Sequence, residues 1–176
     1  MKVDVNKFEY RKLTEENIPD LLDFQEIIFS EDENAKETLR RNTYETFFPC
    51  FAPPSLVLGV FYEGNMIAFG ILYVAGEDHE NLAYSLDNHE LLNVEEYANF
   101  KIVIVKKDFR GNGIQSILMK KFEEYAKSIG MKVILATASP KNKYSTNNFD
   151  KGGYQLIKVI KKYGGLTRNL YGKELV

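Results

Sequence analysis

The chain has 176 residues, of which 44% are hydrophobic and 27% charged, with a formal net charge of −2. These values are typical of one globular domain over residues 1–176, and the interleaved charges argue against binding to nucleic acid or to a membrane surface. The single cysteine, Cys50, excludes an internal disulfide, no metal-ligand cluster is evident, and no segment resembles a secretory signal, so we expect a metal-free cytoplasmic protein.

The first half of the chain predicts one strand, two helices and a hairpin. Alternating apolar residues predict a strand over residues 8–13, followed by a helix that begins at Thr14 or Asn17. A second helical stretch is predicted over residues 33–48, where prolines end it. Two β-rich runs, residues 55–62 and 66–74, flank a turn that contains Gly64, and together they predict a hairpin.

The second half predicts strands and helices in alternation, and then a closing hairpin. The segment YANFKIVIV predicts a strand over residues 97–105. Residues 114–129 carry apolar side chains at three- and four-residue spacing, which predicts a long amphipathic helix. A strand (132–138), a helix (141–151) and two strands (154–163 and 166–175) follow. This order predicts a mixed α/β sheet without the strict alternation of a doubly wound nucleotide-binding fold.

The loop between strand 97–105 and helix 114–129 has the features of an anion site. The first N–H groups of a helix lack internal acceptors, and the helix dipole adds positive charge there. Gly111 and Gly113 allow a close backbone approach, and Arg110 adds a cation suited to phosphate. The loop therefore predicts a phosphate or diphosphate site. The alternative is a plain strand–turn–helix connection, in which the glycines serve only the turn.

The same segment, Arg110-Gly111-Asn112-Gly113-Ile114-Gln115, resembles the diphosphate-binding motif [Q/R]-x-x-G-x-[G/A] of the GNAT superfamily of N-acetyltransferases. Val105 stands at the strand valine that commonly precedes this motif. Residues 142–154 resemble a second family element, N-x-x-A-x-x-x-Y-x-K-x-G-F, and match it at Asn142, Lys151, Gly153 and Tyr154.

The resemblance implies a GNAT acyl-CoA N-acyltransferase fold: a mixed, mostly antiparallel, seven-stranded sheet with flanking helices, in which strands four and five splay apart. It implies acetyl-CoA as cofactor and an amine as acceptor, either a small molecule or a peptide. The cofactor-binding residues implied by the resemblance, through strand backbone groups, loop amides and one side chain, are Val103, Ile104, Val105, Arg110, Gly111, Asn112, Gly113, Ile114, Gln115, Ser116 and Asn142.

Two departures from the family pattern matter. Gln115 replaces the usual glycine or alanine, so its side chain is expected to turn away from the ligand. Phe149 stands where many members carry the tyrosine that protonates the departing thiolate. Ser145, one helical turn earlier, or Tyr144 could supply that proton, and Glu96 is a candidate general base.

The sequence leaves three further questions open. Arg168 and Lys173, in the last predicted strand, either face the gap and meet an acidic group or are exposed edge charges. The protein is a monomer or a homodimer. Because Phe149 lacks a transferable proton, the alternative to an acetyltransferase is a non-catalytic coenzyme A-binding regulatory or sensor domain.

Overall fold

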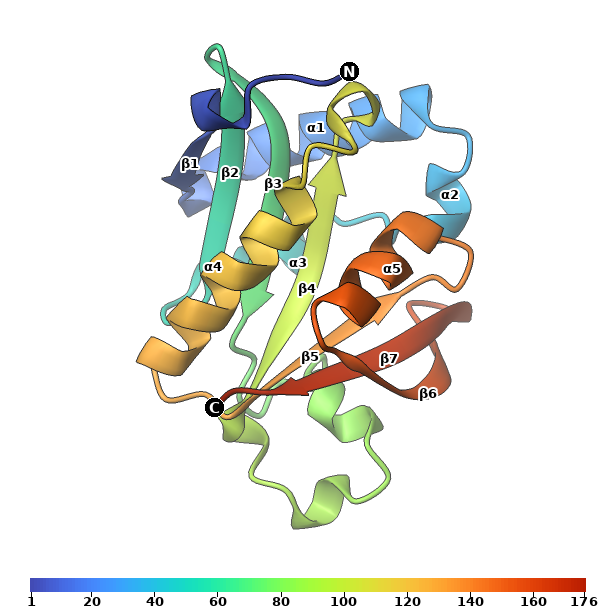
Figure 1. Ribbon diagram of the computed structural model, residues 1–176. Helices are drawn as coiled ribbons and strands as arrows, with labels where there is room; N and C mark the ends of the chain where they lie inside the picture. The colour runs from blue at the N-terminus through green and yellow to red at the C-terminus, as the bar shows by residue number, and fades with distance from the viewer.

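The computed structural model describes residues 1–176 and is built around one seven-stranded sheet (Figure 1). The strand order is β1-β2-β3-β4-β5-β7-β6, and only β4 and β5 run parallel. The predicted mixed, mostly antiparallel sheet is therefore confirmed. The strands are β1 (Glu9–Lys12), β2 (Leu56–Tyr62), β3 (Asn65–Tyr73), β4 (Tyr97–Val105), β5 (Val133–Ala138), β6 (Gln155–Lys162) and β7 (Leu166–Glu174).

Helices cover both faces of the sheet, as Figure 1 shows. Each face has its own apolar core. Phe122 of α4 and Phe149 of α5 belong to the core on one face, whereas Phe24 of α1 and Phe47 of α3 belong to the core on the other. None of the helices has both the length and the apolar character needed to cross a bilayer. The helices are α1 (Ile18–Glu31), α2 (Ala35–Thr38), α3 (Tyr44–Phe47), α4 (Ile114–Ser128) and α5 (Lys143–Lys151).

The prediction of one helix over residues 33–48 is wrong, because the helical conformation is interrupted between α2 and α3. Leu39 is extended, with φ −120° and ψ 140°. The buried Gln25 side chain holds the break in place: its Nε2 donates to the Asn42 carbonyl at 2.8 Å, and its Oε1 accepts from the Asn42 N–H at 2.7 Å. A tertiary contact thus overrides the local helical preference.

The last strand is not at an edge of the sheet. Strand β7 lies between β5 and β6, so β6 forms the edge. Arg168 is therefore on an interior strand and is 4% exposed, which excludes the alternative of an exposed edge charge. The turn between β6 and β7 begins at Tyr163, whose φ of 53° is unusual for a residue with a side chain.

Strands β4 and β5 are paired along only half of β4. Their register runs from Tyr97 opposite Val133 to Phe100 opposite Ala136. From there to Val105, β4 is paired with β3 but not with β5. The pairing of β4 with β3 slips at this same point, because Lys101 is an extra residue between the Phe100 and Ile102 pairs. Such a bulge bends a strand. It directs β4 away from β5, and Figure 1 shows the two strands diverging. The predicted splay of strands four and five is confirmed.

Candidate active site

Two adjoining cavities open where β4 leaves β5. The inner cavity lies beside the splay point and is lined by residues such as Phe100, Lys101 and Thr137. The outer cavity continues past the end of β4 toward the start of α4, beside Val105 and Arg110. The two cavities meet at six residues that line both of them: Thr38, Leu39, Val103, Gln115, Asn142 and Ser145.

The loop before α4 presents free backbone donors. Gly113 caps the helix in the left-handed region, at φ 76°, and contributes no side-chain cap. The first hydrogen bond into the helix joins the Ile117 N–H to the Gly113 carbonyl at 3.0 Å, so the amides from Gly111 to Ser116 have no acceptor within the protein. The Arg110 amide differs, because it donates to the Lys107 carbonyl at 3.3 Å. A helix start with free amides is the arrangement that binds phosphate groups.

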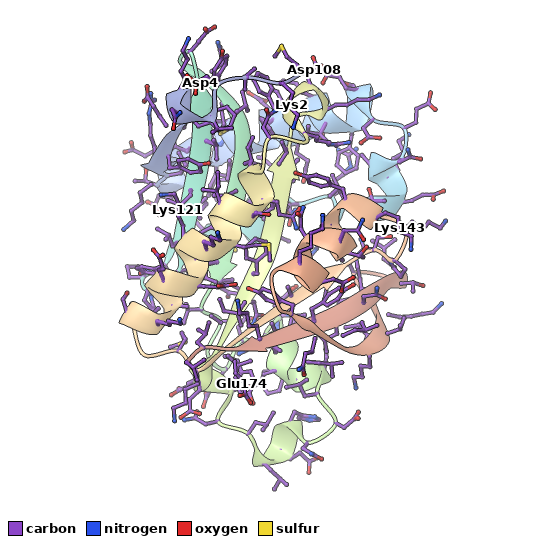
Figure 2. The ribbon with its side chains drawn as sticks, in the orientation of Figure 1. Lys2, Asp4, Asp108, Lys121, Lys143 and Glu174 are labelled. Carbon is purple, nitrogen blue, oxygen red and sulfur yellow. The ribbon has the colours of Figure 1, made fainter.

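The outer cavity has an excess of positive charge. The Arg110 guanidinium is partly neutralised, because its Nη1 lies 2.9 Å from the Asp32 carboxylate. Lys141 pairs with Glu37 at 2.9 Å. Lys107 and Lys143 line the cavity without a carboxylate partner, and Figure 2 shows Lys143 on α5. Contrary to the sequence-based expectation, the unpaired cations are therefore these lysines and not Arg110.

The Asp32 carboxyl remains ionised in this setting. Burial raises its pKa, but the hydrogen bonds from Arg110 and from the Asn34 amide, together with the Arg110 charge, outweigh burial and hold the pKa below its ordinary value. The carboxylate thus holds the Arg110 side chain, whose Nε also donates to the Val105 carbonyl at 3.3 Å. Arg110 ties the end of α1 to the end of β4 and shapes the outer cavity.

The free edge of β4 offers backbone groups at alternate residues. The Lys106 N–H donates to the Ile67 carbonyl on β3 at 2.9 Å. Because backbone groups alternate along an antiparallel strand, those of Ile104 also point to β3, whereas those of Val103 and Val105 point into the splay. Of the three strand residues predicted to pair with a ligand, Ile104 is therefore not oriented to do so.

The Gln115 side chain points toward α5, where its Nε2 donates to the Ser145 Oγ at 3.1 Å. The residue is 4% exposed and lines both cavities. Asn142 stands beside this contact and caps α5, accepting from the Ser145 N–H at 3.1 Å. The structure thus brings Gln115, Ser145 and Asn142 together where the cavities meet.

The other predicted catalytic residues lie in different places. Phe149 lines the inner cavity, and its ring stacks on Tyr171 with centroids 5.1 Å apart. Tyr144 reaches only the outer cavity. Glu96 lies just before β4, at the end where β4 and β5 are paired, and forms a salt bridge with Lys132 at 2.9 Å. It lines neither cavity, so its position does not support a general base there.

Several predicted loop residues have structural side-chain roles. Ile114 is buried in the core, and the Ser116 hydroxyl donates to the Asn148 Oδ1 at 3.3 Å. The Asn112 Nδ2 donates to the Met1 carbonyl at 2.8 Å and to the Phe109 carbonyl at 2.9 Å, which fixes the loop. In Figure 2 this region is marked by Lys2 and Asp108. None of Asn112, Ile114 and Ser116 lines either cavity, so any role that they have in binding an anion would belong to their backbone amides.

The inner cavity contains residues that the sequence did not identify as a group. Its only charged side chains are three cations, Arg40, Lys101 and Arg168, and no carboxylate or imidazole lines it. Arg40 and the neighbouring loop were missed because that segment was predicted as helix, although the pair Thr43 and Thr46 forms a capping box that signals a new helix start. Lys173 is outside the cavities and bonds to Glu123 at 3.1 Å.

Comparison with known proteins agrees with this geometry. The profile of the acetyltransferase (GNAT) family matches residues 18–154. No curated protein matches the chain by sequence.

Solved structures share the fold at low identity. The acetyltransferase of GNAT family from Streptococcus pneumoniae has a TM-score of 0.71 at 14% identity, over 96% of this chain and 99% of that one. An aminoglycoside acetyltransferase in complex with coenzyme A and kanamycin has a TM-score of 0.68 at 14% identity, over 95% and 94%. The ribosomal-protein-S18-alanine N-acetyltransferase from Escherichia coli has a TM-score of 0.68 at 12% identity, over 96% and 94%. With its splayed strands, its free helix-start amides and the profile match over most of its length, the chain belongs to the acetyltransferase (GNAT) family.

Proposed function

We propose that the protein is an acetyl-CoA-dependent N-acetyltransferase that acetylates a primary amine by direct attack. The observation that carries this proposal is that the outer cavity is lined both by Gln115, which belongs to the segment of free amides before α4, and by Val103 and Val105 on the edge of β4 that β5 does not pair. The free amides before α4 fit the diphosphate of coenzyme A. The unpaired edge of β4 fits the extended arm of coenzyme A, which contains amide groups. The solved aminoglycoside acetyltransferase complex that contains coenzyme A supports the same use of the fold.

The residues present fit coenzyme A. The amides from Gly111 to Ser116 would hold the diphosphate, with Lys107 and Lys143 balancing its charge. The Val103 backbone groups and the Val105 N–H would pair with the extended arm of coenzyme A. The free Nδ2 of Asn142 lies where the two cavities meet. When bound, acetyl-CoA supplies the acetyl thioester that the amine attacks.

We propose that the Ser145 hydroxyl donates a proton to the departing thiolate as the C–S bond breaks, and takes a proton from the nitrogen that has attacked, which loses one as the amide forms. The Ser145 Oγ accepts a hydrogen bond from Gln115 Nε2, which leaves the hydroxyl proton free to be donated and stabilises charge on the oxygen. Tyr144 reaches only the outer cavity, which makes it the weaker candidate.

The amine must lose a proton before it can attack, and no general base lines the inner cavity. The two cations there that lack a carboxylate partner, Lys101 and Arg168, provide another route. Nearby positive charge disfavours an ammonium group and lowers its pKa, so the acceptor would release its proton to water as it enters. The cavity would thus favour the neutral amine, which is the nucleophilic form.

The test combines calorimetric titration of acetyl-CoA with thiol release across a panel of amines. Binding together with acceptor-dependent thiol release and an acetylated product detected by mass spectrometry is the expected result. Absence of any binding would refute the proposal.

A regulatory or sensor domain that binds coenzyme A without catalysis is the second candidate. Two observations favour it: Phe149 carries no hydroxyl, and the inner cavity has no carboxylate or imidazole. Tight acetyl-CoA binding with no thiol release from any amine would support this candidate over the enzyme.

A further inference from the structure

Arg168 is a buried cation with no carboxylate partner. Its side chain lines the inner cavity and the residue is 4% exposed. Its two protein hydrogen bonds go to neutral carbonyls, from Nη1 to Thr167 at 2.9 Å and from Nη2 to Thr38 at 3.2 Å. Arginine carries five N–H donors and stays protonated at neutral pH. Three donors and a full charge thus remain for a ligand.

Arg40, which lines the same cavity, differs from Arg168 because its charge is neutralised. It forms a bidentate salt bridge with Glu80, with N–O distances of 3.0 and 3.1 Å. The centre of the Tyr163 ring lies 4.6 Å from the Arg40 guanidinium carbon and 5.9 Å from that of Arg168. Arg168 has the same aromatic neighbour but lacks the acid.

The remaining lining of the cavity adds positive charge and no negative charge. Lys101 is also a lining residue, with its Nζ 4.6 Å from the centre of the Tyr73 ring, and it has no salt-bridge partner. A buried charge is costly unless it is paired. An amine acceptor without a compensating anion would be repelled by this lining, because it arrives as an ammonium ion.

We propose that the acceptor amine also carries a carboxylate, and that this carboxylate pairs with Arg168 in the inner cavity. The planar fork of arginine matches a carboxylate with two parallel hydrogen bonds. The inner cavity has a volume of about 70 Å³, which suits a compact group beside Arg168. The inference rests on the proposed acetyltransferase function and names the class of acceptor, an amino acid or a peptide that offers a carboxylate near its amine.

The test compares amines that differ only in one anionic group, a carboxylate or, as a second arm, a phosphate. Free L-amino acids and dipeptides are paired with their C-terminal amides, and ethanolamine is paired with O-phosphoethanolamine. We expect kcat/KM to be at least about tenfold higher for the acids than for their amides, as a charge-assisted hydrogen bond would give. In Arg168→Gln, KM for the acids should rise by about that factor while the amides change little, and Arg168→Lys should restore part of the preference.

Two controls make the result interpretable. Arg11→Gln removes an exposed arginine that pairs with Glu9 and lines neither cavity, so its acid-to-amide ratio should equal that of the wild type. Calorimetry with acetyl-CoA should give the same affinity for Arg168→Gln as for the wild type, which shows that the fold and the cofactor site are intact.

A second readout does not depend on turnover. Saturation-transfer NMR should detect N-acetyl amino acids bound to the wild type, their amides more weakly, and neither strongly on Arg168→Gln. Such binding without turnover would support the acceptor class while contradicting catalysis. Turnover with no preference for acids, a preference for O-phosphoethanolamine over every carboxylate, or the absence of any Arg168-dependent binding would overturn the inference.

Discussion

Replacing Ser145 by alanine should slow the chemical step without weakening cofactor binding. The substitution removes the hydroxyl proposed to protonate the departing thiolate, whereas the Ser145 N–H keeps its bond to Asn142 Oδ1, so α5 stays capped. The cost to folding comes from Gln115 Nε2, which loses its acceptor in a buried setting, and is about 1 kcal/mol.

The size of the kinetic effect follows from the leaving group. General acid catalysis contributes about 10²–10⁴-fold. A thiol, with a reference pKa of about 8.5, leaves more readily than an alcohol or an amine, so the lower end applies. We expect kcat to fall about 100-fold, equal to about 2.7 kcal/mol in the barrier.

The assay is steady-state thiol release with saturating acceptor, together with the KM for acetyl-CoA. Ser145→Thr keeps a hydroxyl and should recover most of kcat. Ser128→Ala is the matched control, because its hydroxyl bonds only to the Tyr125 carbonyl at the far end of α4. Wild-type kcat in Ser145→Ala, or a threonine variant as slow as the alanine variant, would refute the assignment of Ser145 as the acid.

Three further substitutions test other parts of the structure. Gly113→Ala meets no atom within 4 Å, so its cost comes from the left-handed backbone, about 1 kcal/mol, and calorimetry should show weaker acetyl-CoA binding. Arg110→Gln should cost about 1 kcal/mol in urea denaturation. Because the folded-state pKa of Asp32 is depressed, its stabilisation is present above the unfolded pKa and is lost as pH falls through the folded value, so the wild-type advantage should shrink below about pH 4; a pH-independent difference would contradict the pair. Thr43→Ala breaks the capping box of α3 and should lower thermal stability by about 1 kcal/mol, and an unchanged melting temperature would contradict that role.

The local sequence pattern was sufficient to predict the elements that depend only on residues close together in the chain. The turn at Gly64 and the apolar stripe of α4 depend on nearby residues alone, so the β2–β3 hairpin and α4 lie where the sequence predicts them. The free amides around Gly113 could also be predicted, because the first N–H groups of any helix lack internal acceptors.

What the sequence missed depends on contacts between distant residues. The interruption of the helix after α2 depends on the hydrogen bonds between the Gln25 side chain and the Asn42 backbone, and these two residues are 17 positions apart in the sequence. The order β5-β7-β6 decides whether Arg168 is buried or exposed, and alternation along the strand alone cannot distinguish an interior strand from an edge strand. The splay came from the family resemblance, since no local signal marks the bulge at Lys101.

We propose that the amides leading into α4 and the free edge of β4 form one coenzyme A site. The decisive experiment is a titration of ¹⁵N-labelled protein with coenzyme A, followed by amide NMR. We expect saturable shifts of the Gly111–Ser116 amides together with those of Val103 and Val105. Saturable binding that leaves these amides unchanged and shifts a different surface would contradict it.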